Sequence, residues 1–188
     1  MHINIPTKFY FINTFKKNNI DKLDVNTGVI FRNYSKKVSI YEIIKAKKYC
    51  KKKGIKFFLS NNIKLSIKLG LDGTYIPSFN NQINYIGSFS LPKAFKIIGS
   101  AHNLKEILIK KKQKCDEVFL SPLFKVDKSK KFLNFSKFNL IAINSKTSCI
   151  ALGGINQSNY KKIKLLKSRG FATISWAKKN GLSELRPF

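Results

Sequence analysis

Short apolar runs recur along this chain, and polar or helix-like stretches separate them. Runs of this length are typical of strands that are buried on both faces of a sheet. There are eight such runs, at residues 9–12, 29–32, 56–60, 74–76, 96–99, 117–120, 149–152 and 172–175. Strands that alternate with helices form parallel βαβ units, so the pattern predicts a small (β/α)₈ TIM barrel. The same periodicity also allows an open, doubly wound sheet.

The stretches between the runs contain helix signals. Residues 39–53 place apolar side chains mainly on one stripe with lysines opposite, and Gly54 follows where a C-cap glycine is expected. That stripe consists of Ile40, Ile43, Ile44 and Tyr49 or Cys50. Asn103 followed by Glu106 has the form of a capping box and predicts a helix just after the fifth strand. Residues 13–28 are rich in Asn, Lys and Asp, so the first helix is expected to be shortened to a turn or two.

Three joints between a helix and the next strand resemble one another, at residues 70–73, 114–117 and 168–171. Their similarity is typical of repeated βα units. Asp72, Asp116 and Glu117 precede strands, so we expect them at the N-terminal end of the barrel, where residues serve stability.

The formal net charge is +28, from 37 Lys and Arg residues against 9 Asp and Glu residues. Such a surplus is typical of proteins that bind nucleic acid, an anionic membrane surface or phosphorylated substrates. The lysines are spread over almost every segment, and no aromatic and basic platform accompanies them. We therefore favour a solvated basic surface over a nucleic-acid footprint.

The chain has three cysteines, Cys50, Cys115 and Cys149, with no CxxC pair and no histidine at ligand spacing. Free thiols in a reducing cytoplasm are the expected state. Residues 1–12 include Lys8 and lack a cleavage site, so we expect them to form the first strand and not a signal peptide. No apolar run approaches the roughly 20 residues of a membrane span. We expect one cytoplasmic barrel domain over residues 1–188.

The loops that follow the strands are where barrels build their sites. After the seventh strand, Gly153 and Gly154 allow backbone N–H groups to approach an anion, and a helix from about Gln157 is expected to present its N-terminus there. Together with Ile174 and Ser175 at the end of the eighth strand, this loop fits a phosphate site. The alternative is a tight turn that simply requires glycine.

Several segments in a fixed order carry a family resemblance. They are residues 28–32 (GVIFR), 59–62 (LSNN), 69–76 (LGLDGTYI), 97–102 (IIGSAH), 121–124 (SPLF), 153–155 (GGI) and 174–175 (IS). In this order they resemble the thiamine phosphate synthase and TenI family of barrels, and the match covers nearly the whole chain.

The resemblance implies a transferase of thiamine biosynthesis. In that family the synthase joins hydroxymethylpyrimidine diphosphate to a phosphorylated thiazole, whose nitrogen captures the pyrimidine cation as diphosphate leaves. The family surrounds the leaving group with an arginine and a lysine after strand two, a lysine after strand six, and magnesium held by acidic residues. Phosphorylated small molecules are therefore the expected partners.

The resemblance transfers part of that machinery to this chain. Arg32 matches the arginine and Ser100 matches a serine near the diphosphate, whereas Tyr34 replaces the lysine after strand two. After strand six, Lys128 or Lys130 matches the family's lysine only with a shift. The expected catalytic residues are Arg32, Ser100, Lys128 and Lys130.

The positions of the family's metal-binding acids fall on amides. They correspond to Asn62, directly after Asn61, and to Asn80. Amide oxygens can bind Mg²⁺, but without a charge they bind it much more weakly than carboxylates do. The resemblance therefore implies Mg²⁺ at Asn62 and Asn80, and the two replacements weaken that expectation.

The histidines of the chain are His2 and His102. TenI proteins use a histidine after strand six, where this chain has Pro122. His102 follows the fifth strand and either starts the helix or contacts substrate, where it would be a neutral-pH acid or base. For Phe124 and Trp176 we favour packing over the barrel end to stacking on a heterocycle.

The expected substrate-binding residues are Asn61, Asn62, His102, Gly153, Gly154, Ile174 and Ser175. Three functions are compatible with the sequence: a transferase with a divergent metal site, a non-catalytic or TenI-like barrel that binds a thiazole phosphate, and a basic nucleic-acid-binding protein. One cavity shared by Arg32, Ser100 and the two glycines would favour the first two functions.

Overall fold

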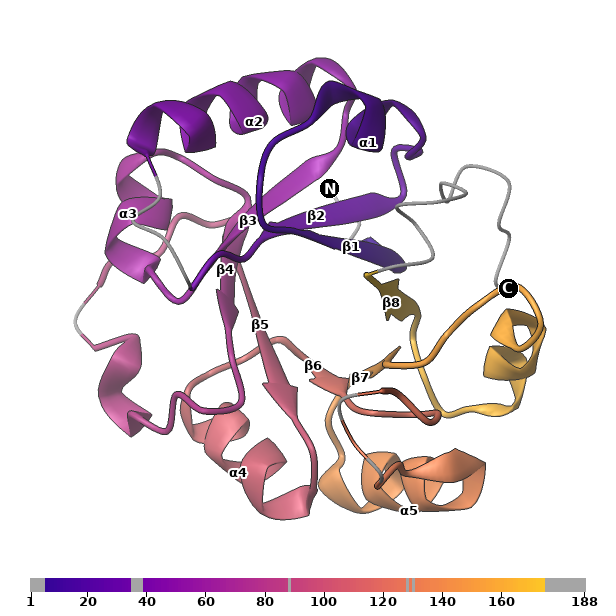
Figure 1. Cartoon of the computed structure of the whole chain (residues 1–188). Helices are drawn as coiled ribbons and strands as arrows, with labels where there is room; N and C mark the ends of the chain where they lie inside the picture. The colour runs from indigo at the N-terminus through magenta and orange to yellow at the C-terminus, as the bar shows by residue number, and fades with distance from the viewer. Residues whose placement is uncertain (1–5, 35–38, 88, 128, 130, 175–188) are drawn as a thin grey trace.

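The computed structural model describes residues 6–34, 39–87, 89–127, 129 and 131–174. Eight strands close into one barrel in the order β1 to β8, and every neighbouring pair is parallel, including β8 with β1 (Figure 1). The strands are β1 (Lys8–Ile12), β2 (Thr27–Phe31), β3 (Lys56–Ser60), β4 (Gly73–Ile76), β5 (Lys96–Ala101), β6 (Glu117–Leu120), β7 (Cys149–Leu152) and β8 (Phe171–Thr173). The closure confirms the predicted (β/α)₈ barrel and excludes the open sheet.

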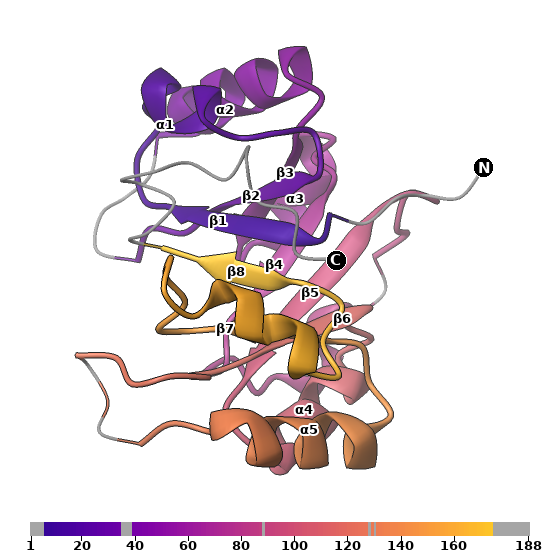
Figure 2. The ribbon, with the colours of Figure 1, turned by 90° about the vertical axis from the view of Figure 1, so that its right-hand side faces the viewer.

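Helices cover the outside of this barrel (Figure 1). They are α1 (Lys17–Asp21), α2 (Ile40–Lys52), α3 (Ile63–Lys68), α4 (Leu104–Lys112) and α5 (Asn134–Ser145), with two 3₁₀ helices, η1 (Ile83–Tyr85) and η2 (Tyr160–Leu165). Figure 2 shows α1 and α2 on one side of the barrel and α4 and α5 on the opposite side. The five residues of α1 confirm the shortened first helix. Within the described ranges, no helix is long and apolar enough to cross a membrane.

The ends of α2 and α4 follow the sequence signals. Gly54 follows Lys53, the C-cap residue of α2, and has a φ of 67°, and the Asn103 side chain caps α4 by accepting a hydrogen bond from Glu106 N at 3.0 Å. The apolar stripe of α2 needs one correction, because Ile40 is 53% exposed. The buried face is centred on Ile43, Ala46 and Cys50, and Ile40 lies at the very start of the helix.

The segment after β7 also differs from the expectation. The sequence predicts a helix from about Gln157, whereas the chain makes a turn there and begins a 3₁₀ helix only at Tyr160. Asn159 Oδ1 accepts a hydrogen bond from Asn156 N, and Asn156 Oδ1 accepts one from Ser158 N, both at 2.9 Å. Such local side-chain bonds favour a turn over a helix. No helix N-terminus therefore lies at Gln157.

Aromatic side chains fill the interior of the barrel. Phe9 and Phe119 pack edge to face with ring centroids 5.1 Å apart, and Phe11 meets Tyr75 in the same way at 5.3 Å. Each such pair adds about 0.5–1.5 kcal/mol beyond the burial of apolar area. Gly28 makes room for the rings, since a Cβ at this position would lie 2.7 Å from the Phe9 ring. The small barrel therefore has a closely packed core.

Ion pairs fasten the N-terminal end of the barrel, where the strands begin. Three of them follow one pattern, in which a lysine starts an odd-numbered strand and an aspartate precedes the next strand. These pairs are Lys8–Asp24, Lys56–Asp72 and Lys96–Asp116. Asp72 and Asp116 also accept a hydrogen bond from the second residue of the lysine's strand, Phe57 N at 2.9 Å and Ile97 N at 2.8 Å. The aspartates therefore lie at the stabilising end, as predicted.

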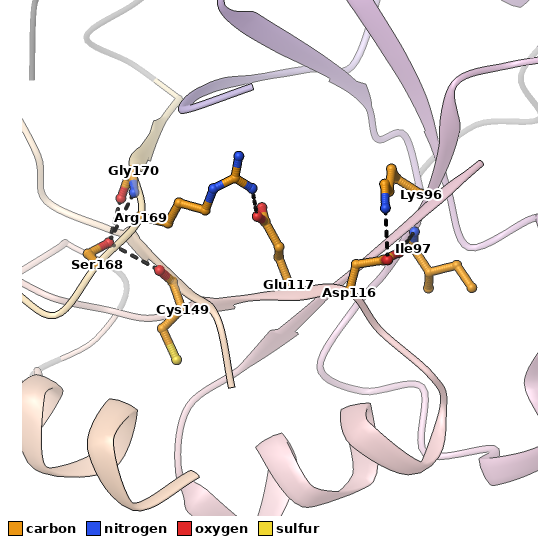
Figure 3. A network of polar contacts seen from close by, with 8 residues as sticks. All are labelled: Lys96, Ile97, Asp116, Glu117, Cys149, Ser168, Arg169 and Gly170. Carbon is orange, nitrogen blue, oxygen red and sulfur yellow. Dashed lines mark hydrogen bonds and ion pairs between the residues drawn. The ribbon is translucent and has the colours of Figure 1, made fainter. Parts of the chain in front are cut away.

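A fourth pair joins Glu117, at the start of β6, to Arg169 (Figure 3). Burial raises the pKa of Glu117, and the positive charge of Arg169 opposes that rise. The neighbouring Ser168 accepts a hydrogen bond from Ala151 N at 3.0 Å and donates one to Gly170 O at 2.6 Å. The Ser168 hydroxyl thus binds backbone groups of the joint before β8, as the carboxylates of Asp72 and Asp116 do at the joints before β4 and β6.

Replacing Asp116 with alanine should lower the free energy of unfolding by about 1–2 kcal/mol, because Ile97 N and Lys96 both lose their acceptor. Urea unfolding followed by circular dichroism measures this loss. Asp127→Ala is the matched control, since it removes one exposed acid that has no ion pair within the described residues. The control should stay within about 0.5 kcal/mol of the unsubstituted protein. Equal losses in both variants would contradict a stabilising role for the joint.

Several titratable groups are buried. The cysteines are free, and burial raises the pKa of Cys50 and Cys115 to about 12 and that of Cys149 to about 11. Two lysines depart from the solvated surface that the sequence predicts, because Lys8 is 3% exposed and Lys110 is fully buried. Lys8 has its ion pair with Asp24, whereas Lys110 has no ion pair with any described residue.

Candidate active site

A cavity of about 1140 Å³ opens at the C-terminal end of the barrel. Five residues that the sequence singled out line it, from the ends of four different strands: Arg32, His102, Gly153, Gly154 and Ile174. The glycine loop and Arg32 therefore lie at the same end of the barrel, which is the geometry that a shared site requires.

Arg32 follows β2 directly, and its backbone N donates to Ile12 O at 2.7 Å. Its guanidinium lies over the Phe11 ring, with Cζ 4.7 Å from the ring centroid. Burial raises the pKa of Tyr75, and the nearby positive charge of Arg32 opposes that rise. Arg32 forms no ion pair with a described carboxylate. A cation held by aromatic rings and without an internal anion is suited to bind an anionic ligand.

The glycine loop after β7 has two features of an anion site. Gly153 and Gly154 have φ values of 97° and 70°, a region that favours glycine. Within the described part of the chain, the N–H groups of both glycines have no hydrogen-bond partner. A Cβ at Gly154 would lie 2.7 Å from Lys125 O, so the turn also requires glycine for packing. The two interpretations of the sequence are therefore compatible.

His102 has a defined tautomer. Its Nδ1 lies 2.8 Å from Ser121 O, which can only accept, so in the neutral ring Nδ1 carries the hydrogen and Nε2 is left as an acceptor. The backbone N of His102 donates to Glu106 Oε2 at 2.9 Å, which completes the cap of α4. The residue therefore combines the helix-starting role with a position on the cavity wall.

Ser100 lies near the cavity but does not line it. It is 4% exposed, and its hydroxyl accepts a hydrogen bond from the Tyr75 hydroxyl at 2.8 Å. Lys128, Lys130, Ser175 and Trp176 lie outside the described residues. Phe124 packs against Phe135 at 5.5 Å between ring centroids, in agreement with the packing role that we favour.

The amides after β3 and β4 form a separate cluster. Asn62 Oδ1 accepts a hydrogen bond from Leu65 N at 3.0 Å and so caps α3. Asn80 Nδ2 donates to Asn61 Oδ1 at 2.7 Å, and Asn80 Oδ1 accepts from Gln82 N at 3.0 Å. All three side-chain oxygens are thus engaged, and the described residues contain no group of three His, Cys, Asp or Glu side chains that could hold a metal. These residues do not fit a Mg²⁺ site.

Sequence reasoning missed two cationic residues of the cavity wall. Lys131 and Lys137 line the cavity together with Lys125, and the one acid on its wall among the described residues is Asp127. Lys137 lies in the first turn of α5. Lys137 could have been found from its position just after a strand-to-helix loop. These loops and the helix starts that follow them surround the C-terminal end of a barrel.

Comparisons with known proteins agree with this geometry. The sequence profile described as thiamine monophosphate synthase matches residues 24–177. A thiamine-phosphate synthase of Prochlorococcus marinus subsp. pastoris is 29% identical over 148 residues, which cover 77% of this chain and 41% of that protein. Another from Clostridioides difficile is 26% identical over 149 residues, covering 77% of this chain and 69% of that protein. The chain thus spans less than half the length of the Prochlorococcus relative.

The fold is similar to that of a solved thiamine phosphate pyrophosphorylase from Pyrococcus furiosus, with a TM-score of 0.70. The two chains are 15% identical, and the alignment covers 95% of this chain and 93% of the other. At that identity the likeness speaks for the fold alone. The match of the sequence profile, which spans most of the chain, goes further: the chain belongs to the thiamine monophosphate synthase family.

Proposed function

We propose that the chain is a transferase that couples hydroxymethylpyrimidine diphosphate to thiazole phosphate, forming thiamine phosphate and releasing diphosphate. The observation that carries this proposal is the pairing, on one cavity wall, of Arg32 with the N–H groups of Gly153 and Gly154, which have no partner among the residues that the structure describes. Two anion sites in one cavity suit a reaction between two phosphorylated molecules. The names of the related proteins support the same reaction.

The chemistry is a substitution at the methylene carbon of the pyrimidine. The bond from this carbon to the diphosphate oxygen breaks, and the thiazole nitrogen forms a new bond to the carbon. Negative charge grows on the departing oxygen, so cations positioned there lower the barrier. In our proposal Arg32 and Lys125 bind the diphosphate, and the backbone of Gly153 and Gly154 holds the phosphate of the thiazole.

The remaining site residues have supporting roles in this proposal. His102 Nε2 can accept a hydrogen bond from substrate, because the contact of Nδ1 with Ser121 O orients the ring. Ile174 contributes an apolar edge to the cavity, and Ser100 contacts the diphosphate only if its hydrogen bond with Tyr75 rearranges. Lys128 and Lys130 come three and five residues after Lys125 in the sequence and remain predicted catalytic residues.

A second candidate function is a barrel that binds thiazole phosphate without catalysis. The observation that favours it is the engagement of the Asn61, Asn62 and Asn80 oxygens in internal hydrogen bonds. A protein with this function keeps the glycine loop and has no use for a site that binds diphosphate.

One assay separates the two functions. Purified protein is incubated with both precursors and saturating Mg²⁺, and thiamine phosphate is measured over time, while calorimetry measures the binding of thiazole phosphate alone. Product that grows in proportion to the protein supports the transferase. Binding without product overturns the transferase and supports the non-catalytic barrel, and the absence of both overturns both proposals.

A further inference from the structure

We propose that Lys110 is a positioning residue: its buried side chain holds the loop after β4 and, through that loop, the strand ends beside Arg32. For its effect on catalysis this inference rests on the function proposed above. Its structural part, the coupling of Lys110 to the loop, can be tested without any activity.

The lysine makes a complete set of contacts with neutral oxygens. Lys110 Nζ donates to Pro77 O at 2.8 Å, to Asn80 O at 2.7 Å and to Gln113 Oε1 at 2.9 Å. An ammonium group has three donors, and all three are used here. Two of the acceptors are backbone carbonyls of the loop after β4, so one side chain of α4 fixes both ends of the segment 77–80.

A second buried side chain, that of the C-cap residue of α4, acts on the same loop. Gln113 follows Lys110 by three residues, is fully buried, and donates from Nε2 to Asn80 O at 3.0 Å and to Gln82 O at 2.9 Å. The packing of α4 against η1 brings these residues to the loop. Asn80 O therefore accepts from two side chains at once.

A glycine in β5 leaves space for the Lys110 side chain. A Cβ at Gly99 of β5 would lie 2.9 Å from Lys110 Cδ and 2.9 Å from Cys115 Sγ. The glycine thus leaves the space through which the lysine stem crosses β5 to reach the neighbouring loop. Lys111 and Lys112, the next residues of the same lysine run, are exposed.

Stability alone does not explain a lysine at this position. A buried ammonium without a carboxylate partner is costly, and an apolar side chain of similar size would fill a helix-to-strand contact at lower cost. Burial lowers the pKa of Lys110 to about 8, which is a direct sign of that cost. What the lysine amino group gives, in its charged or its neutral form, and an apolar side chain cannot, is N–H donors that hold the loop carbonyls in place.

The loop after β4 also contacts residues at the end of the barrel where the cavity opens. Asn80 Nδ2 donates to Asn61 Oδ1 at 2.7 Å, which ties the loop to the end of β3. Phe79 packs edge to face on Tyr34 with ring centroids 5.3 Å apart, and the Tyr34 hydroxyl is 2.7 Å from Ser60 Oγ. Tyr34 comes two residues after Arg32. The loop is therefore linked to the segment that carries Arg32.

The direct test is hydrogen exchange of the backbone amides of residues 78–87 at pH 7. Lys110→Met should speed this exchange about tenfold, because the carbonyls of Pro77 and Asn80 lose a donor. Lys112→Met is the matched control, since it removes the same charge from an exposed position of the same helix and should leave the exchange unchanged. Unchanged exchange in folded Lys110→Met would overturn the proposal.

The pH dependence provides a second test, which needs no substitution at Lys110. Opening of the loop hydrates Lys110 and returns its pKa towards 10.5, so the closed loop binds fewer protons than the open one between pH 8 and 10.5. Protection of residues 78–87 should therefore rise about tenfold from pH 7 to pH 9 after correction for intrinsic rates. Glu106 and Cys115 are the other charged or titratable groups near Lys110, and the measurement is repeated in Cys115→Ala. Protection that does not change with pH in both proteins would overturn the coupling.

The catalytic part is read from the transferase assay. Lys110→Met should lower kcat/KM about tenfold at pH 7 through misplacement of Arg32, and Lys112→Met should stay within about twofold of the unsubstituted protein. Equal activity of Lys110→Met and the unsubstituted protein would overturn the positioning role in catalysis. If the unsubstituted protein forms no product, the proposed function fails, and the two exchange experiments still decide whether Lys110 holds the loop.

Discussion

Replacing Arg32 with alanine is expected to lower kcat/KM for thiamine phosphate formation by about thirty- to a thousand-fold. This corresponds to a loss of about 2–4 kcal/mol of transition-state stabilisation. The reason is that Arg32 lies on the cavity wall with its guanidinium over Phe11 and with no carboxylate partner among the described residues. Steady-state kinetics with both precursors measure the change.

Arg32→Lys is the informative control, because it keeps the charge and loses the planar group that can bind two phosphate oxygens at once. Its activity should lie between that of Arg32→Ala and that of the unsubstituted protein. Circular dichroism and urea unfolding should show all three proteins folded to the same extent. A folded Arg32→Ala variant that retains kcat/KM within about threefold would remove Arg32 from the catalytic machinery.

Replacing Gly154 with aspartate should weaken the binding of thiazole phosphate by about a hundredfold or more. A Cβ at this position would lie 2.7 Å from Lys125 O and 2.7 Å from Phe124 Cβ, and the φ of 70° disfavours any side chain. The added carboxylate also places a negative charge where the N–H groups of the loop are expected to meet phosphate. Isothermal titration calorimetry with thiazole phosphate measures the loss.

Gly54→Asp controls for the backbone strain in this experiment. Gly54 has a φ of 67°, close to that of Gly154, but it follows α2 and does not line the cavity. The control variant is expected to lose stability and to bind thiazole phosphate with normal affinity. If Gly154→Asp binds as tightly as the control, the phosphate site lies elsewhere.

The fold could be predicted from the chain because its signals are local. Buried runs such as residues 149–152 have the length of strands, and the glycine and capping signals at Gly54 and Asn103 mark helix ends without any knowledge of the rest of the molecule. The helix expected after β7 failed for an equally local reason, since the side chains of Asn156 and Asn159 take part in a turn. Asparagine favours both turns and helix starts, so these residues alone did not decide between the two.

The candidate site was only partly predictable, because its decisive contacts join distant segments. Arg32 and the glycine pair stand at the ends of apolar runs, and such places could be read from the sequence. The role of Lys110 could not be predicted from the sequence, since it belongs to a run of three lysines. It is buried only because its side chain passes over Gly99 in the folded protein. The engagement of Asn80 likewise depends on partners 19 and 33 residues away.

The ion pairs at the N-terminal end of the barrel have a consequence for how the chain can be divided. Each of the five ion pairs among the described residues stays within β1 to β4 and their helices or within β5 to β8 and theirs. The described ion pairs thus divide the barrel into two half-barrels, which are joined at their seams by backbone ladders, apolar contacts and hydrogen bonds such as that from Tyr75 to Ser100. A circular permutation that opens the chain at residues 89–94 would leave every one of these charges paired. It would also leave the bonds from Lys110 and Gln113 to the loop after β4 as side-chain links across the new gap between the ends.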